Sequence, residues 1–263
     1  NQAASERGLL NSYAAYAKVM AERQEAISAD DERLRLAELD RTRTALLAAV
    51  SHDLRSPLAV VKASVSSLRD TKISFSAEDQ AELLETIEEA SDRLNALVTN
   101  LLDMSRISTQ AVIAYTTEVN LDLAVKHAVA PLRANENFQI DIDPNLVVMA
   151  DPGLLDRVLG NICENAVKYT PTGTKARIDA AIAGDRVIVR IADTGPGITG
   201  QDREKIFAPF QRLGDIPQGD GVGLGLAVAR GLSEAMNATI SIEDTPGGGL
   251  TFVLDFPRPQ ESP

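Results

Sequence analysis

Cysteine is almost missing from this sequence of 263 residues, in which Cys163 is the single thiol. One cysteine cannot form an internal disulfide, and such usage fits a reducing compartment. The sequence also lacks an apolar run of about 18 residues, the length that a membrane-spanning helix needs. It has no signal-like start, so we expect this segment neither to cross a membrane nor to be exported.

Positive charge is scarce as well, with 26 Lys and Arg residues against 38 Asp and Glu residues and a net charge of −12. No broad basic field is therefore expected to hold a nucleic acid or an anionic membrane surface. Apolar residues make up 44% of the chain, which is enough for a substantial core. Because the sequence begins at Asn1 without a methionine, we expect it to be a piece of a longer protein, of which a missing part could be membrane-bound.

The chain has two regions of different periodicity. Up to about residue 110 there is scarcely a strand signal, whereas the later segments KARIDAAIA and DRVIVRIAD carry β-branched residues in short runs. This change predicts a helical domain followed by an α/β domain. The expected divisions are a helical linker over 1–45, a helical domain over 46–110, an α/β domain over 111–257 and a disordered tail over 258–263.

Apolar residues of the first region follow the spacing of a helix-bundle seam, three or four residues apart. The longer stripe consists of Leu83, Ile87, Ala90, Leu94, Leu97, Leu101 and Met104, and a matching stripe runs from Leu47 to Leu68. The polar segment RDTKISFSAED separates them, with Ser76 as the expected helix cap. One hairpin cannot cover stripes of this length, so we predict a homodimer in which two helical hairpins form a four-helix bundle.

The stretch SHDLRSPL holds His52, one of only two histidines, directly before Asp53. At about 100° per residue, His52 lies opposite the apolar seam and faces water. A neutral imidazole is a competent nucleophile, and a neighbouring carboxylate can hold its tautomer and take its proton. An exposed histidine beside an acid means little by itself, so its interpretation depends on the rest of the chain.

In the segment NICENAVKYT, the residues Asn161, Asn165 and Lys168 share one face of a predicted helix. Amide oxygens suit Mg²⁺, and a lysine one turn further on suits phosphate. The opposite face is apolar and consists of Leu155, Leu159, Ile162, Cys163 and Ala166. We therefore expect Cys163 to be a packing residue and not a reactive thiol.

Two glycine-rich segments follow this helix. In DTGPGI, Asp193 ends a predicted strand and is able to accept a hydrogen bond from an exocyclic amine, while Gly195 and Gly197 let the backbone approach a ligand. In GDGVGLGLAVA, glycines lead into an apolar helix whose first N–H groups make an anion site. Each segment is weak evidence alone, but the order of all three elements predicts a nucleotide pocket.

This ordered set resembles the bacterial sensor histidine kinases of two-component systems. SHDLRSPL resembles their H box, NICENAVKYT the N box, DTGPGI the first G box, IFAPF the F box and GVGLGLAVA the second G box. Stretches such as NLLDMSRI and IFAPFQRLGD resemble the narrower group of KdpD-type potassium-responsive kinases. The resemblance implies a dimerisation and phosphotransfer hairpin followed by a Bergerat-type ATP-binding domain, an α/β sandwich with a mixed sheet under three helices.

The resemblance also implies roles for single residues. His52 matches the phosphorylated residue and Asp53 the acid that activates it. Asn165 matches the Mg²⁺ ligand, with Asn161 nearby. Lys168 matches a phosphate contact and Tyr169 a nucleotide contact. Asp193 matches the acid that binds adenine, and Gly195 and Gly197 match the turn that supports it. The hinge of a lid at about 213–220 over the phosphates is matched by Gly221, Gly223 and Gly225, and Leu224 between them is expected to be a further nucleotide contact.

In this family ATP and Mg²⁺ are the cofactors, and the phosphoryl group passes from histidine to an aspartate of a response-regulator receiver domain that docks on the bundle. Members that also act as phosphatases usually carry Thr or Asn three residues after the acid, where they orient a water. This chain has Ser56 at that position. A serine hydroxyl does similar work less rigidly, which leaves phosphatase activity open.

Two other functions stay open at this stage. Gyrase and Hsp90-like relatives of the same pocket hydrolyse ATP with a carboxylate that activates water. Glu164 lies beside Asn165, but about 100° away on the helical wheel, and such proteins do not need the histidine hairpin. The other alternative is a pseudokinase, a dimeric signalling scaffold that binds nucleotide without transferring phosphate.

Overall fold

The computed structural model describes residues 50–70, 72–132, 137–171, 173–200, 202–211 and 223–259. The chain divides into two compact units, Asn1–Asp53 and Leu54–Pro263. The predicted helical linker over 1–45, the predicted lid at 213–220 and Gly221 all lie outside the described residues. Most of the predicted tail also lies outside them, although Arg258 is described and its N–H donates to the carbonyl of Asp185 across 3.0 Å.

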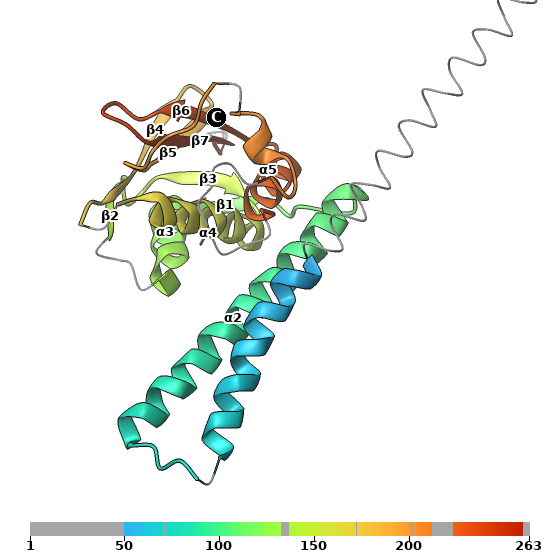
Figure 1. Cartoon of the computed structure of the whole chain (residues 1–263). Helices are drawn as coiled ribbons and strands as arrows, with labels where there is room; N and C mark the ends of the chain where they lie inside the picture. The colour runs from blue at the N-terminus through green and yellow to red at the C-terminus, as the bar shows by residue number, and fades with distance from the viewer. Residues whose placement is uncertain are drawn as a thin grey trace, which may run out of the picture. The chain divides into compact units, whose positions relative to one another are not determined.

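A helical hairpin forms the first part of the described chain (Figure 1). Residues 50–69 are helical, and α2 covers Ala77–Ser108. The predicted cap at Ser76 is confirmed: its hydroxyl accepts from the N–H of Asp79 at 3.0 Å, and the Asp79 carboxylate accepts from the N–H of Ser76 at 3.0 Å. This reciprocal pair satisfies two N–H groups that a helix start leaves without partners, so α2 begins sharply at Ala77.

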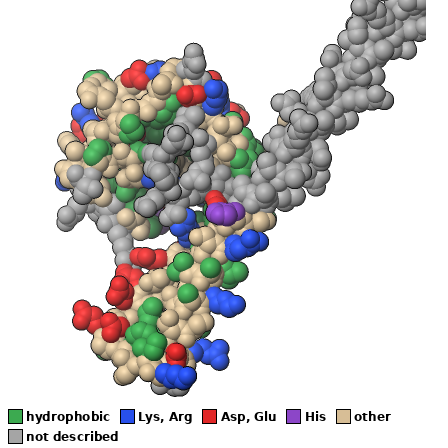
Figure 2. Space-filling view, viewed as in Figure 1, with side chains coloured by type: hydrophobic (Ala, Val, Ile, Leu, Met, Phe, Trp, Pro, Cys, Tyr) green, Lys and Arg blue, Asp and Glu red, His purple; other side chains and the backbone are tan. Residues whose placement is uncertain are grey.

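The apolar seam of the hairpin is only half covered within one chain. Ala90 is buried, whereas Leu97 is intermediate and Leu101 is exposed. Further large apolar side chains are exposed on the hairpin, namely Leu58, Val60, Val65, Ile73, Leu84, Val98 and Leu102. Acidic side chains gather along α2, and basic ones lie along the other helix (Figure 2). A single hairpin thus leaves much apolar surface in water, which is unfavourable unless another surface covers it.

The second part of the chain is an α/β domain, as predicted. Its elements are β1 (Thr117–Asn120), α3 (Leu121–Val129), η1 (Ala130–Leu132), β2 (Phe138–Asp141), β3 (Val147–Ala150), α4 (Pro152–Tyr169), β4 (Ala176–Ala183), β5 (Arg186–Ala192), η3 (Lys205–Phe207), α5 (Gly225–Ala235), β6 (Thr239–Asp244) and β7 (Leu250–Pro257). The segments KARIDAAIA and DRVIVRIAD contain β4 and β5, so both strand predictions are confirmed.

Five strands form a mixed sheet in the order β2-β4-β5-β7-β6. The pairing of β2 with β4 is parallel, and the other pairs are antiparallel. A separate antiparallel ribbon joins β1 to β3. The helices α3, α4 and α5 form a layer against the sheet, so the predicted sandwich of a mixed sheet and three helices is confirmed (Figure 1).

The core lies between these two layers and explains the local sequence patterns. Every second residue of β5 is buried, and α4 contributes a continuous buried stripe. The largest fully buried side chains come from both layers: Leu121, Leu155, Leu159, Ile162, Ile178, Ile191, Leu232, Met236, Leu254 and Phe256. Each contributes about 1.5–3 kcal/mol through burial, which fixes α4 and the ends of the strands against each other. Among the described helices, none is long and apolar enough to cross a bilayer.

Candidate functional site

Helix α4 presents a core side and a cavity side, as its sequence predicts. Its start is capped by Asp151, whose Oδ1 accepts from the N–H groups of Gly153 at 3.0 Å and Leu154 at 3.1 Å. The predicted apolar face is fully buried, and it consists of Leu155, Leu159, Ile162, Cys163 and Ala166. Burial, helped by the negative charge of Glu164, raises the pKa of the Cys163 thiol to about 12. Cys163 is therefore a packing residue, as expected.

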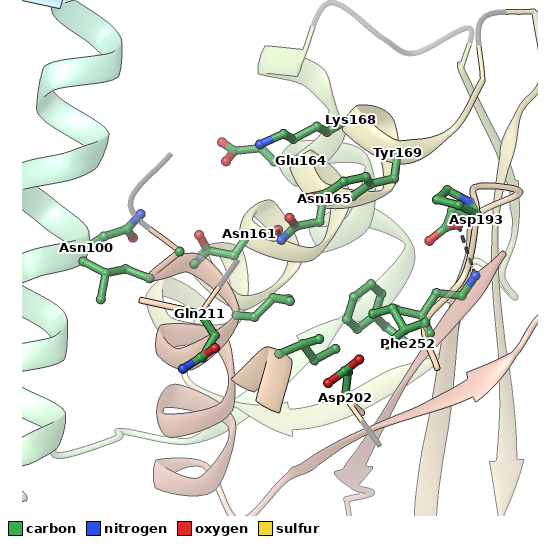
Figure 3. A pocket seen from close by; sticks show the side chains of 18 of the residues that line it. Asn100, Asn161, Glu164, Asn165, Lys168, Tyr169, Asp193, Asp202, Gln211 and Phe252 are labelled. Atoms are coloured by element: carbon green, nitrogen blue, oxygen red, sulfur yellow. Dashed lines mark hydrogen bonds between the residues drawn. The ribbon is translucent and has the colours of Figure 1, made fainter. Parts of the chain in front are cut away.

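A cavity of about 770 Å³ opens on the other side of α4 (Figure 3). This volume is ample for a drug-sized or nucleotide-sized ligand. Most of the predicted nucleotide-binding residues line it: Asn161, Asn165, Lys168, Tyr169, Asp193, Gly197, Gly223, Leu224 and Gly225. The cavity thus brings together residues from three motifs that are far apart in the sequence. Gly195 does not line the cavity, but its N–H donates to Asp193, which does.

Asp193 directly follows β5, and only 4% of its surface is exposed. Its Oδ1 accepts from the N–H of Gly195 at 2.8 Å and from that of Leu250 at 3.1 Å. Both donors point to the same oxygen, so Oδ2 keeps its capacity to accept a hydrogen bond from a ligand. Burial raises the pKa of Asp193, although the two N–H donors oppose this shift.

The glycines of the first G box are required by close backbone contacts. A Cβ atom on Gly195 would lie 2.6 Å from the carbonyl oxygen of Tyr169, so no side chain fits there. Gly197 has a φ of +70°, a value that favours glycine. These glycines therefore allow close contacts within the protein's own backbone, and their predicted approach to a ligand stays a prediction.

An apolar wall of the cavity was not predicted as part of the site. It is formed by Ile198 from the loop after β5, Ile206 from η3, and Leu250 and Phe252 from β7. The sequence does carry a signal for part of this wall, because Ile206 belongs to the IFAPF segment. The register of β7, which brings Phe252 opposite Ile191, has no such local signal.

The second glycine segment leads into α5 beside the N box, as predicted. A Cβ atom on Gly225 would lie 2.9 Å from Oδ1 of Asn161, so the helix start packs closely on α4. Gly223 has a φ of +72°, and its carbonyl accepts from the N–H of Phe210 at 2.9 Å. At the N-cap, Leu224 offers no side-chain hydrogen bond to the first turn. The first N–H groups of α5 are therefore suited to a bound anion.

The amide of Asn165 has a defined orientation. Its Nδ2 donates to the carbonyl of Asn161 at 2.8 Å, which leaves Oδ1 as the group that is available at the cavity. An amide oxygen is a suitable ligand for Mg²⁺, so this residue fits the implied metal. The described residues contain no cluster of three or more His, Cys, Asp or Glu side chains that would hold a metal without a ligand's help.

Glu164 also lines the cavity, contrary to the expectation from the helical wheel. On the helical wheel, Glu164 points away from Asn165 but lies within about 40° of Lys168. The side chains of Glu164 and Lys168 therefore both lie at the rim of the cavity. Protein packed around the carboxylate raises the pKa of Glu164, while the positive charge of Arg157 opposes the shift. Orientation alone therefore does not exclude Glu164 as a carboxylate near a bound ligand.

Helix α2 supplies another part of the cavity wall, through Arg93, Ala96, Leu97 and Asn100. Beside it, Arg157 of α4 donates to Oδ1 of Asn100 at 3.1 Å. The same guanidinium lies 2.6 Å from Oδ2 of Asp103, a charge contact without the alignment of a hydrogen bond. The sequence patterns gave no sign of these long-range contacts.

His52 is exposed, as predicted, with 81% of its side chain accessible. Its Nδ1 lies 3.0 Å from Oδ1 of Asp53. An ionised carboxylate only accepts, so Nδ1 carries the proton and the lone pair of the neutral ring is on Nε2. Ser56 is exposed one helical turn after His52. His127, the second histidine, pairs with Asp156 of α4 at 2.7 Å on the surface, an acid that its sequence neighbours do not supply.

Comparisons with known proteins support both the helical hairpin and the α/β domain. Residues 42–110 match the His Kinase A (phospho-acceptor) domain, and residues 150–260 match the histidine kinase-, DNA gyrase B- and HSP90-like ATPase family. The Sensor protein KdpD of Mycobacterium tuberculosis is 43% identical over 99% of this chain and 31% of that protein. The Sensor protein KdpD of Escherichia coli is 33% identical over 88% of this chain and 26% of that protein. The chain thus spans about a third or less of the length of these curated relatives.

Solved structures share the fold. The histidine kinase AdeS of Acinetobacter baumannii superposes with a TM-score of 0.58 at 23% identity, covering 80% of this chain and 98% of that one. Full-length ShkA in complex with AMPPNP gives a TM-score of 0.57 at 29% identity, covering 82% of this chain and 46% of that one. With its phosphoacceptor hairpin, its ATPase-type sandwich and its KdpD-like sequence, this chain belongs to the sensor histidine kinases, a family of ATP-dependent protein-histidine kinases.

Proposed function

We propose that this chain is the kinase core of a KdpD-type sensor: it binds Mg-ATP, phosphorylates its own His52 and passes the phosphoryl group to an aspartate of a response-regulator receiver domain. The observation that carries the proposal is the single cavity that gathers Asn165, Lys168, Asp193 and Gly225 from three separate motifs. The solved relative ShkA binds AMPPNP, an ATP analogue, which supports the same ligand class here.

The cavity divides into a base end and a phosphate end. At the base end, Oδ2 of Asp193 accepts from the adenine 6-amino group, and the wall with Ile198 and Phe252 covers the ring. At the phosphate end, Lys168 and the first N–H groups of α5 bind the phosphate oxygens, with Tyr169 beside them. Leu224 is a further nucleotide contact, and Gly223 and Gly225 together with the undescribed Gly221 would form the hinge of the lid at 213–220.

Asn165, with Asn161 beside it, would hold Mg²⁺ at this phosphate end. The metal supplies positive charge that offsets the charge of the phosphate oxygens. The residues of the chain hold the triphosphate in a position in which its terminal phosphorus is exposed to the acceptor. This arrangement makes the reaction depend on positioning more than on covalent chemistry by the pocket.

His52 is the acceptor in this proposal. The Nε2 lone pair attacks the γ-phosphorus, an N–P bond forms, and the bond from this phosphorus to the bridging oxygen breaks to release ADP. The ring gains positive charge, which Asp53 offsets by accepting the Nδ1 proton. Ser56, one turn away, would orient a water for dephosphorylation if this chain also acts as a phosphatase.

The partners follow from the surfaces of the hairpin. We propose a homodimer, because a second hairpin would cover apolar side chains of the seam that one hairpin leaves exposed, such as Leu101. The receiver domain would dock on the bundle near His52. We assign residues 46–110 to dimerisation and phosphotransfer and residues 111–257 to ATP binding. By its relation to KdpD proteins, the full-length protein would be a membrane-anchored sensor that responds to potassium.

Incubation of the chain with γ-labelled ATP and Mg²⁺ tests the proposal. Acid-labile, base-stable label that vanishes in His52→Gln supports the kinase. Phosphate release that does not depend on His52 would favour the ATPase, for which the position of Glu164 at the cavity gives a specific reason. Bound ATP with no label would favour the scaffold. In the ATPase case, Glu164→Gln should abolish phosphate release, whereas in the kinase case it should leave His52 as the acceptor.

A further inference from the structure

The turn between β6 and β7 contains three consecutive glycines, Gly247 to Gly249, each with a positive φ. The values are +96°, +111° and +110°, which L-residues with a side chain rarely adopt. The segment TPGGG predicts a hairpin turn, and the antiparallel pairing of β6 with β7 confirms it, but a simple hairpin turn needs only one or two such positions. The structure shows a further use for the third glycine, because it lies against Asp193, the residue that directly follows β5.

Gly249 is in close contact with the backbone of Asp193. A Cβ atom on Gly249 would lie 2.8 Å from the carbonyl carbon of Asp193 and closer still to its oxygen, and 2.9 Å from Cα of Thr194. These neighbours are backbone atoms and cannot rotate away as a flexible side chain would. The contact continues on the other side, since a Cβ atom on Gly197 would lie 3.2 Å from the carbonyl oxygen of Gly249.

The pairing of β5 with β7 changes at this contact. The N–H of Asp193 donates to the carbonyl of Leu250 at 2.9 Å, as in an antiparallel ladder. The N–H of Leu250, however, donates to Oδ1 of the Asp193 side chain at 3.1 Å. The last bond of the ladder therefore holds the carboxylate instead of extending the sheet, and it depends on how closely residue 249 approaches residue 193.

We propose that Gly249 is a positioning residue for base recognition: by lacking a side chain, it allows the N–H of Leu250 to fix the Asp193 carboxylate, with Oδ2 presented to the adenine 6-amino group. This inference rests on the proposed ATP binding at the cavity. Gly249 itself does not line that cavity, so it acts only through Asp193. A side chain at this position would push Asp193 and Leu250 apart and release the carboxylate.

The neighbouring Gly248 provides a matched control. Its φ of +111° equals that of Gly249 within a degree, so alanine would be equally strained in the backbone. A Cβ atom on Gly248, however, would meet no atom within 4 Å. Any difference between Gly248→Ala and Gly249→Ala therefore reports the contact with Asp193 and not the general cost of alanine in the turn.

The experiment measures nucleotide affinity by displacement of a fluorescent ATP analogue from the full chain, with ATP and with purine riboside triphosphate, which lacks only the 6-amino group. The wild type and Gly248→Ala should prefer ATP. Gly249→Ala should lose about tenfold or more of this preference, the effect of one misplaced hydrogen bond to a charged group. A merely structural defect would lower the affinity for both nucleotides equally and leave the ratio of the two affinities unchanged.

Two outcomes are decisive and separable. If the wild type does not bind ATP, the proposed function fails; if it binds ATP and Gly249→Ala keeps the wild-type preference, the inference about Gly249 is overturned. Should Gly249→Ala not fold, the α-hydroxy analogue of leucine at position 250 replaces the N–H donor by an ester oxygen and adds no bulk. That substitution should also lower the preference for ATP, and an unchanged preference would overturn the inference as well.

Discussion

The Nδ1 atom of His52 lies 3.0 Å from Oδ1 of Asp53, the next residue in the chain. The side chain of His52 is largely in water, whereas only 19% of the Asp53 side chain is exposed. The carboxylate thus holds the ring by one nitrogen and leaves the other accessible. Consecutive residues on a helix point about 100° apart, so this contact depends on the side chains turning toward each other.

Replacing Asp53 by Asn should slow phosphorylation of His52 by a factor of about 10² to 10⁴, because the amide cannot take the Nδ1 proton or offset the charge on the ring. The rate of label incorporation from γ-labelled ATP measures this effect. The affinity for ATP should stay at its wild-type value, since Asp53 is not among the residues that line the cavity. A variant that labels as fast as the wild type would show that Asp53 has no role in activating His52.

Asp193→Asn should abolish ATP binding and yet stabilise the protein without nucleotide. Burial raises the pKa of Asp193, so the fold favours its protonated form and the buried charge costs stability at neutral pH. The neutral amide avoids this cost while its oxygen still accepts from Gly195 and Leu250. Urea unfolding at pH 7 should show a higher free energy of unfolding for the variant. This gain should shrink as pH falls through the raised folded-state pKa of Asp193, and it should be gone below the unfolded-state pKa of an aspartate, about 3.9. A gain that grows toward acid pH would contradict the assigned sign.

Cys163 should be inert in the folded protein, because its thiol is fully buried and its pKa is raised to about 12. The thiolate is the reactive form, so almost none is present at pH 8. Titration with a thiol reagent should give no reaction in buffer and one equivalent after denaturation, a clean measurement because the chain has one cysteine. Fast modification of the native protein would mean that the α4 core opens readily or that the thiol is not packed as described.

Asp151→Ala should lower the free energy of unfolding by about 1–2 kcal/mol, since it removes the cap of α4. Burial disfavours the charge of Asp151, but the N–H groups of Tyr115, Leu154 and Gly153 together outweigh it and lower the pKa. The stabilisation is therefore present above the unfolded-state pKa of an aspartate and is lost as pH falls through the lower, folded-state pKa.

Asp156→Ala is the matched control for this cap, because Asp156 lies on the same helix and makes a surface pair with His127. Its cost should stay within about 0–1 kcal/mol. Denaturant unfolding at pH 7 and at acid pH compares the two variants. Equal losses for both, or a loss for Asp151→Ala that persists unchanged at acid pH, would contradict the capping role.

Local sequence patterns predict a feature of the fold or of the site when the residues that form it lie close together in the sequence. Single segments predict the two faces of α4 and the strands β4 and β5 through their periodicity, and the cap at Ser76 through its residue type. The contact of Gly249 with Asp193 depends instead on the register between β5 and β7, residues that are far apart in the chain. The glycine run is visible in the sequence, but nothing local indicates which backbone it meets.

The same limit applies to ionic contacts. The pairs of His127 with Asp156 and of Arg157 with Asp103 join different helices, and single-helix patterns cannot predict them. Glu164 shows a further limit, because the angle on a helical wheel gives a direction but not the width of a cavity. A helix of known orientation next to a wide opening exposes more than one of its faces to a ligand.

The account depends most on His52 as the acceptor of the terminal phosphoryl group. Fragmentation mass spectrometry of the chain after incubation with Mg-ATP, performed at neutral pH to preserve phosphohistidine, locates the modification directly. We predict one phosphoryl group on the peptide that contains His52, absent from Asp193→Asn because that variant cannot bind ATP. A phosphoryl group on another residue, or an unmodified His52 in a protein that binds ATP with wild-type affinity, would contradict the central claim.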